Sequence, residues 1–197
     1  MVVTARVRET SVRLEPPALV DKTLRFVKLF YGTNRERKNG CAGVTETRWD
    51  APEPCRPNSY YGADMAVAGD DDGLEVGTLS VTFPSGHERG KVERPLKIFS
   101  FTLGEEDPER HVVISELRSY PSDHAAWAAD VRATGRDQAF IYVHGFANTF
   151  DDAARGAAQL AYDLDFDLDS DFRGVPMLFS WPSRGEVGAY INDMEAA

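Results

Sequence analysis

The sequence has few residues of the kinds that build disulfide or metal sites. Its only two cysteines, Cys41 and Cys55, lie in a segment rich in glycine and proline without C-x-x-C spacing. Nothing in this pattern requires a disulfide, so we expect two free thiols. The four histidines show neither H-x-x-H nor H-E-x-x-H spacing, so no metal site is predicted. His87 lies in a charged segment and is expected at the surface.

Positive charge and long apolar runs are also scarce. The chain has 22 Lys and Arg against 32 Asp and Glu, for a net charge of -10. Nucleic-acid binding needs clustered basic residues, so no nucleic-acid partner is expected. No stretch approaches the length of a membrane span, and the first ten residues lack the apolar core of a signal peptide. We therefore expect no membrane partner and a cytoplasmic location.

Motifs for nucleotides and calcium are absent as well. The glycine-containing segments fit neither G-x-G-x-x-G nor the P-loop, so no cofactor is predicted. Aspartates alternate from Asp163 to Asp171 and resemble a calcium loop at first sight. An EF-hand needs glycine at its sixth position and glutamate at its twelfth, and no starting point here provides them. A solvated acidic turn is the better interpretation.

The stretch from Gln138 to Ser183 organises the chain. Ala139 to Val143 is an unbroken run of aromatic and β-branched residues after an alanine, which is typical of a strand buried on both faces of a parallel sheet. A second apolar run covers Val175 to Phe179. Strand, helix and strand in this order predict a parallel βαβ unit.

The helix between these runs is expected to begin near Phe150. Asn148 or Thr149 is a suitable N-cap, and Asp151 and Asp152 in the first turn match the helix dipole. Apolar residues at helical spacing define one face. They are Phe150, Ala153, Ala154, Ala157, Ala158, Ala161 and Leu164. Because most of them are alanine, the helix is expected to lie close against a sheet.

The remaining chain divides into an arm and one partial domain. Residues 1–23 are polar, contain Pro16-Pro17 and are expected to form a flexible arm, and residues 24–197 form the domain. Residues 35–72 are rich in glycine, proline and charge and predict a long irregular loop. Five further elements are predicted. They are strands at 24–31, 74–83, 95–103 and 111–120, with a helix between Ser122 and Gly135.

Several segments together resemble a known superfamily. They read FYGTNR from Phe30, HERGKVERP from His87, HVVISEL from His111, then HGF at His144 and FSWPS at Phe179. This ordered set resembles the α/β-hydrolase superfamily, and within it an esterase/lipase-like family of uncharacterised hydrolases. The resemblance implies an α/β fold that is the front half of a hydrolase sheet. Antiparallel lead-in strands would precede the parallel βαβ unit, and the sheet would be incomplete.

The resemblance also implies roles for the residues after the first parallel strand. The loop Gly145, Phe146 and Ala147 would supply an oxyanion-hole donor, the Phe146 N–H or, as a weaker choice, that of Ala147. Gly145 would allow a tight turn, and His144 would support the loop rather than act as a base. Trp181 would either form a wall of an acyl pocket or simply pack the strand end. Alternatively, the segment is an ordinary turn between strand and helix.

The nucleophile motif of the superfamily does not occur in the sequence. No residue among the 197 fits G-x-S-x-G, and in the family the acid and the histidine follow the nucleophile. The resemblance therefore implies a serine esterase or lipase-type hydrolase in intact form, acting on an ester or similar acyl substrate. No catalytic residue would lie in this chain, and all three would lie downstream. The alternative is a non-catalytic hydrolase remnant that acts as a protein-interaction module.

The family's sheet order has a consequence for the first parallel strand. That strand would lie at an edge, with the backbone groups of Phe140 to Val143 unpaired on one side. An exposed edge is a template for another strand, so self-association through it is expected.

Overall fold

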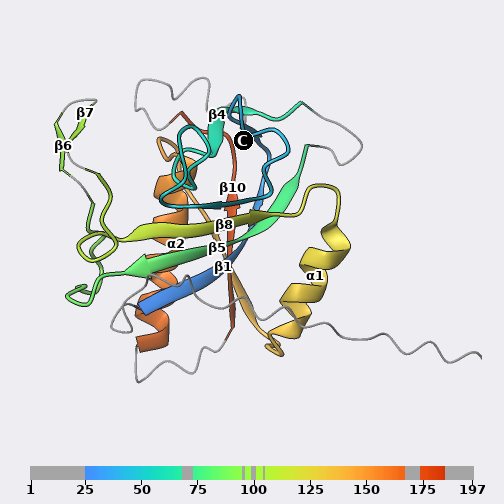
Figure 1. Cartoon of the computed structure of the whole chain (residues 1–197). Coiled ribbons are helices and arrows are strands. Elements are labelled where there is room, and N and C mark those ends of the chain that lie inside the picture. Colours follow the sequence, from blue (N-terminus) through green and yellow to red (C-terminus); the bar gives the residue numbers. More distant parts are fainter. Residues whose placement is uncertain are drawn as a thin grey trace, which may run out of the picture.

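The computed structural model describes residues 25–67, 73–94, 96–98, 101–103, 105–166 and 174–184. The expected arm at residues 1–23 lies outside these ranges, as do Asp167, Asp169 and Asp171 of the acidic segment. Figure 1 shows the elements in chain order. They are β1 (Arg25–Thr33), β2 (Arg35–Arg37), β3 (Glu46–Arg48), β4 (Tyr61–Met65), β5 (Glu75–Phe83), β6 (Leu96–Ile98), β7 (Phe101–Leu103), β8 (Val113–Ser119), α1 (His124–Ala133), β9 (Ala139–Val143), α2 (Phe150–Phe166) and β10 (Val175–Ser180).

The main sheet is mixed and has six strands in the order β3-β8-β5-β1-β10-β9. Strands β3, β8, β5 and β1 pair antiparallel, whereas β10 pairs parallel with both β1 and β9. The expected α/β fold is therefore confirmed, with antiparallel strands before a parallel βαβ unit. Two small sheets accompany it, β2 with β4 and β6 with β7.

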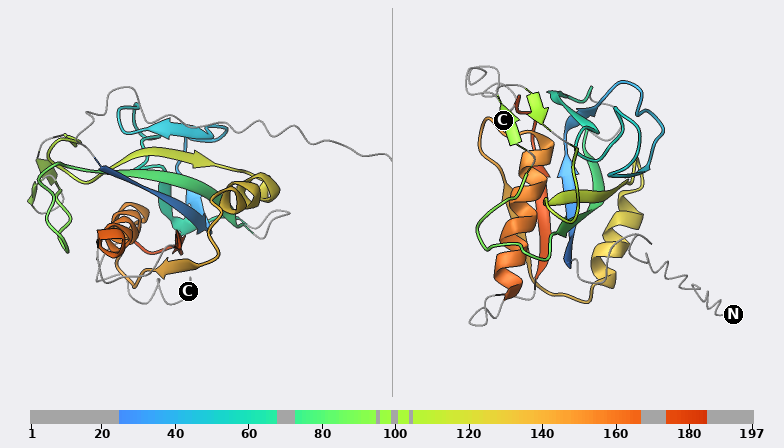
Figure 2. Two further views of the ribbon diagram at one scale, coloured as in Figure 1. Left: turned by 90° about the horizontal axis from the view of Figure 1, so that it is seen from below. Right: turned by 60° about the vertical axis from the view of Figure 1, so that its left-hand side comes forward.

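Helix α2 packs on the sheet through the expected alanine face. Phe150, Ala153, Ala154, Ala157 and Ala158 are all buried, and the helix contacts β10, β1, β5 and β8. Small side chains let the helix approach the strands closely, which explains why this face is mostly alanine. Figure 2 shows α2 lying along the sheet.

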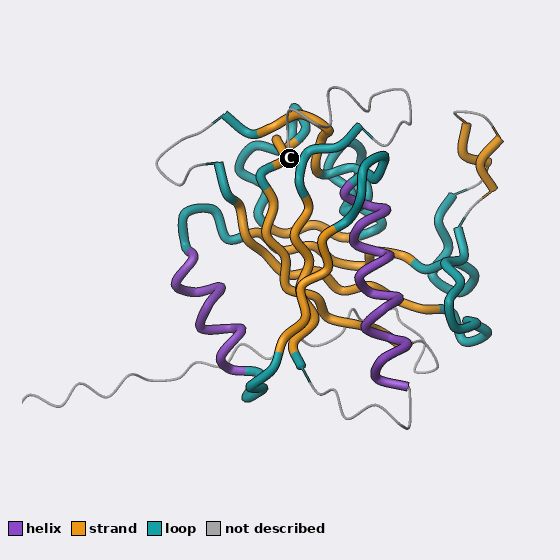
Figure 3. The backbone as a smooth tube through the Cα atoms, turned by 180° about the vertical axis from the view of Figure 1, so that it is seen from behind, coloured by secondary structure: helices purple, strands orange, loops and turns teal. Residues whose placement is uncertain are grey.

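Helix α1 covers the other face of the sheet. Successive residues of a strand point to opposite faces. On β1, Phe30 packs edge-on against Trp127 of α1, whereas Tyr31 packs edge-on against Phe150 of α2. Figure 3 shows the two helices flanking the strands. Among the described helices, none is long and apolar enough to span a membrane.

Strand β9 differs from expectation because it is buried on one face at most. Phe140 and Tyr142 pack toward the core, whereas Ala139, Ile141 and Val143 are exposed. Helix α1 packs over β5 and leaves this face of β9 open. The prediction of burial on both faces was wrong, while the predicted edge position of β9 is confirmed within the described sheet.

Two predictions about loops and strands also need correction. Residues 35–72 are not wholly irregular, because β2, β3 and β4 form within them. Where one strand was expected at 95–103, the described residues 96–98 and 101–103 form two short antiparallel strands, β6 and β7. In both regions the strands have three to five residues, too few for a visible period in the sequence.

Two predictions about single residues were wrong. Cys41 and Cys55 form a disulfide, with Cα atoms 5.4 Å apart, so neither thiol is free. The His87 side chain is only 1% exposed and packs edge-on against the rings of Phe83 and Tyr162, with Nδ1 2.7 Å from Glu93. These two rings, from β5 and α2, also contact each other, so the three rings form one cluster that buries His87. The local charged sequence gave no sign of it.

Candidate functional site

The candidate site lies where β9 and β10 end. These parallel strands are neighbours, so the segment after β9, His144 to Asn148, lies beside the segment after β10, Trp181 to Ser183. This is the carboxyl edge of the parallel strands, where α/β proteins bind ligands. The chain order of the two motifs thus brings HGFAN and SWPS together.

Arg35, the first residue of β2, connects these segments. Its side chain is buried, and its Nε donates to Ser180 Oγ at 2.9 Å. Nη1 donates to the carbonyl oxygens of Gly62 and Ser183, both at 3.0 Å. Nη2 donates to the carbonyl oxygen of Asn148 at 2.8 Å. One guanidinium therefore holds the ends of β9 and β10 together with β4.

His144 is buried within the same network. Its Nδ1 lies 2.7 Å from the carbonyl oxygen of Gly145, which only accepts, so Nδ1 carries the proton. Nε2 then accepts from Ser180 Oγ at 3.2 Å. The ring stacks on Trp181, whose indole N–H donates to the His144 carbonyl oxygen at 2.9 Å. The imidazole thus fixes the loop to the end of β10.

The surroundings of His144 favour its neutral form. Burial lowers the pKa of His144, and the positive charge of Arg35 lowers it further, against hydrogen bonds that oppose the shift. The network requires a neutral ring, because Nε2 has to accept a hydrogen bond from the Ser180 hydroxyl and can do so only without a proton of its own.

Ser180 and His144 have the spacing of a nucleophile and its base but not the setting. Ser180 is fully buried, and its Oγ also accepts from Arg35. His144 Nδ1 binds a backbone carbonyl, whereas a catalytic base is usually oriented by a carboxylate. Ser183 is also buried, with Oγ accepting from the Asn148 N–H at 3.3 Å. Both serines therefore support the loop.

The loop after β9 is held by Asn148. Its side-chain Nδ2 donates to the carbonyl oxygens of Gly145 at 3.2 Å and Phe146 at 2.9 Å. The left-handed residue is Ala147, with φ of 59°, and not Gly145. A Cβ at Gly145 would meet no atom within 4 Å. The tight turn expected at Gly145 falls at Ala147 instead, where the Asn148 side chain stabilises the reversed backbone.

Helix α2 begins immediately after this loop. Thr149 and Asp152 form a capping box: Thr149 Oγ1 accepts from the Asp152 N–H at 3.1 Å, and Asp152 accepts from the Thr149 N–H at 3.0 Å. Burial alone would raise the pKa of Asp152, but bonds from Thr149 and the charge of Arg94 outweigh it and lower the pKa. Of the two expected caps, Thr149 is the one used.

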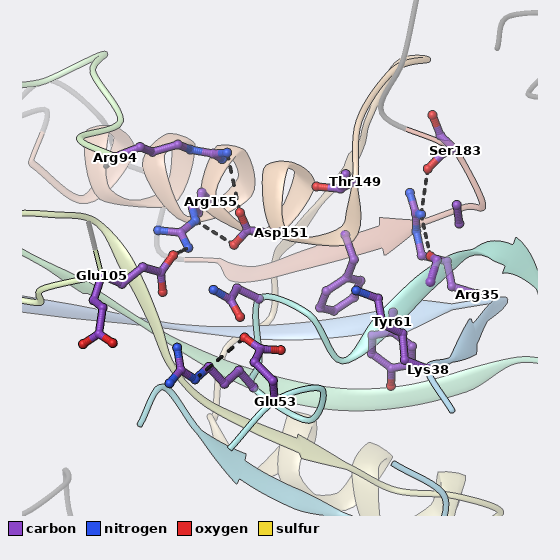
Figure 4. Close-up of a pocket in the computed structure, with 16 residues that line it drawn as sticks. Arg35, Lys38, Glu53, Tyr61, Arg94, Glu105, Thr149, Asp151, Arg155 and Ser183 are labelled. Atoms are coloured by element: carbon purple, nitrogen blue, oxygen red, sulfur yellow. Dashed lines mark hydrogen bonds and ion pairs between the residues drawn. The ribbon is translucent and has the colours of Figure 1, made fainter. Parts of the chain in front are cut away.

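A pocket of about 500 Å³ opens beside the start of α2. Figure 4 shows Arg155 and Arg94 toward one end and Arg35 with Ser183 toward the other. Residues between Lys38 and Ala63 form a further wall. Trp181 does not line this pocket, and among the described residues no group of three or more His, Cys, Asp or Glu is arranged to hold a metal ion.

The sequence predicted one side of this site and missed the other. Gly145, Phe146 and Ala147 lie at the predicted sheet edge, and their role as an oxyanion loop stays a prediction. Arg35 lies in the FYGTNR segment, but no role was predicted for it. Arg155 was missed because it interrupts an alanine-rich helix face, where an arginine normally reaches solvent. Its burial depends on Asp151, one helical turn earlier, and on the distant Glu106.

Comparison with known families supports the predicted resemblance. Residues 121–197 match the model of a family described as an alpha/beta hydrolase of unknown function (DUF900). This stretch contains α1, β9, α2 and β10, and with them the loop after β9 and the buried serines. The searches of curated proteins and of solved structures gave no match. The α/β-hydrolase assignment therefore rests on the C-terminal part of the chain and on the sheet topology.

Proposed function

We propose that residues 139–183 provide the oxyanion loop of a hydrolase that cleaves an ester or similar acyl bond by a serine nucleophile. The observation that carries the proposal is the position of Gly145 to Ala147, beyond the carboxyl end of β9 and next to the start of α2. The match to an α/β-hydrolase family over the same residues supports it. In this role the Phe146 N–H, or less favourably that of Ala147, donates to the developing oxyanion.

Preorganisation of the loop also supports this role. An oxyanion donor is effective when the protein fixes it before the reaction. Arg35, His144 and Asn148 bind the loop carbonyls of residues 145, 146 and 148, which restricts its backbone. The nucleophile is not assigned to any residue of the printed sequence, because no G-x-S-x-G occurs in it.

Backbone NMR tests the oxyanion role directly. We expect p-nitrophenyl methylphosphonate, an anionic mimic of the tetrahedral intermediate, to shift the amide signals of Phe146 and Ala147 in a saturable way. Dimethyl methylphosphonate, which has no charge, serves as the matched control and should leave them unchanged. The proposal fails if the anion shifts neither amide, or if the neutral control shifts both equally.

A second candidate function is a non-catalytic interaction module. It is favoured by one observation, the open face and edge of β9, where Ile141 is 63% and Val143 57% exposed. Such an edge binds a further strand through its backbone, and a second copy of this chain is the partner we propose. Binding of the phosphonate at the loop would favour the hydrolase, whereas association without it would favour the module.

A further inference from the structure

The pocket beside α2 is enriched in positive charge relative to the rest of the chain. Its lining contains five basic and four acidic side chains, whereas the whole chain has 22 and 32. The basic residues are Arg35, Lys38, Arg56, Arg94 and Arg155. Large apolar side chains are few, namely Tyr61 and Phe150. This lining suits a small polar ligand with negative charge better than a hydrocarbon chain.

Most acidic groups in the pocket already bind protein donors. Asp151 accepts from Arg155 Nε at 2.7 Å and lies 3.5 Å from Arg94 Nη1. Glu106 accepts from Arg155 Nη2. Glu53 accepts from the Ser59 hydroxyl at 2.6 Å. Three of the four carboxylates are thus engaged, so a ligand that brings acceptor oxygens fits better than one that brings cationic donors.

Arg155 has a donor that these carboxylates do not satisfy. Its side chain is 1% exposed, and Nη1 has no hydrogen-bond partner in the part of the chain that the structure describes. A buried N–H without an acceptor is unfavourable, so an oxygen atom from outside the protein is expected there. Asn58, which also lines the pocket, has a buried side-chain oxygen without a described partner. The Asn58 oxygen needs a donor and does not favour an oxyanion, so it is the unsatisfied donor of Arg155 that points to one.

Two further sources of positive potential surround this position. Arg94 makes its described contacts, to Asp151 and Asp152, through Nη1. The first turn of α2, which includes Thr149 and Phe150, also lines the pocket, and the start of a helix carries the positive end of its dipole.

We propose that this pocket binds the oxyanion group of a small polar ligand, a carboxylate or a phosphate. Arg155 Nη1 donates to one of its oxygens, and Arg94, Lys38 and the start of α2 stabilise its charge. Arg35 and Ser183 form the other end of the pocket, so a ligand held by its acid group extends toward the loop after β9. Binding of this group does not depend on the hydrolase function.

NMR titration tests the site with two defined probes. Inorganic phosphate and acetate are added separately at constant ionic strength, while the Nε–H signal of Arg155 and the amides of Thr149 to Asp151 are followed. We expect saturable shifts at these positions, and the probe that saturates at the lower concentration identifies the preferred acid group. These signals are different from the amides of Phe146 and Ala147 that report on the oxyanion loop. The two proposals are therefore tested separately, and either can fail without the other.

The test uses variants of exposed or half-buried residues, because these substitutions are not expected to unfold the protein. Arg94→Gln and Lys38→Gln are each expected to weaken probe binding about tenfold. Arg132→Gln, at the exposed end of α1, is the matched control and should bind as the unmodified chain does. The proposal is overturned if neither probe gives a saturable shift, or if both pocket variants bind normally.

Discussion

At the scale of residues, Arg35 is the side chain on which the site depends most. Lysine in its place keeps the charge but cannot reach Ser180 and the carbonyl oxygens of Gly62, Ser183 and Asn148 together. A buried acceptor left without a donor costs about 1–3 kcal/mol. We therefore expect Arg35→Lys to lower the free energy of unfolding by about 2–4 kcal/mol in urea titrations.

The matched control for this substitution is Arg132→Lys on the exposed end of α1. It should change stability by no more than about 0.5 kcal/mol. Equal effects of the two substitutions would contradict the central place of Arg35 in the network.

His144 predicts a pH dependence of stability. Its pKa is lowered in the folded protein, mainly by burial, whereas in the unfolded chain it should be near the usual value of about 6.5. Below that pH the unfolded chain binds a proton that the folded protein does not, so stability falls as the pH decreases. The variant His144→Asn should show a smaller loss between neutral and mildly acidic pH. Unchanged pH dependence in thermal melts would show that His144 does not contribute.

At the scale of residues, the sequence correctly predicted the roles that depend on neighbours within a few positions in the chain. Thr149 as a helix cap and the buried alanines of α2 follow from local spacing and are confirmed. Arg35, Arg155 and His87 were not predicted as buried because each also needs a partner from a distant segment of the chain. These partners are Ser180, Glu106 and Tyr162, respectively. Charged or polar residues are normally exposed, and only the folded contacts reverse that expectation.

At the scale of elements, strand β9 is the feature with the clearest consequence. Its outer edge has no described partner strand, and Ile141 on its open face is 63% exposed. A charged side chain on an edge strand opposes pairing with another chain. We expect the chain to self-associate and Ile141→Lys to weaken this association in sedimentation equilibrium.

Leu160→Lys is the control for this prediction. Leu160 is 41% exposed on α2, so the variant adds the same charge away from the edge. A chain that stays monomeric at all concentrations, or equal behaviour of the two variants, would contradict association through β9.

The elements themselves were predictable where their pattern is long. Strands β1, β5, β8 and β9 and helix α2 fall close to their expected positions, because each has a run of strand-forming residues or a helical face. Strands β2, β3, β4, β6 and β7 were not predictable. Four of them have only three residues, and β4 (YGADM) contains glycine and aspartate, which are depleted in strands. Burial of β9 was misjudged because the same apolar run suits a central strand and an edge strand whose one face is covered.

At the scale of the whole molecule, the Cys41–Cys55 disulfide fixes the segment that forms one wall of the pocket. It closes a loop with a sequence separation of 14, between Lys38 and Arg56 of the lining. Such a loop closure contributes about 3 kcal/mol. The double variant Cys41→Ala and Cys55→Ala should therefore lose about 3 kcal/mol in urea unfolding. Equal stability of the variant would show that the disulfide does not constrain the chain.

The disulfide also bears on where the protein works. Disulfides persist in oxidising compartments and are rare in the cytosol. The cytoplasmic location stays a prediction, and the redox state of this cysteine pair in the cell tests it. Alkylation of cell extracts with and without prior reduction distinguishes a free thiol pair from a disulfide in the cell.

The central claim is that residues 139–183 supply an oxyanion loop and the side chains that support it, but do not supply a nucleophile. Treatment of the 197-residue chain with a fluorophosphonate probe, followed by mass spectrometry and a p-nitrophenyl acetate assay, tests it most directly. We predict no labelled serine and no turnover above the uncatalysed rate, because Ser180 and Ser183 are buried within hydrogen bonds. Turnover abolished by the probe, with the label on Ser180 or Ser183, would contradict the claim.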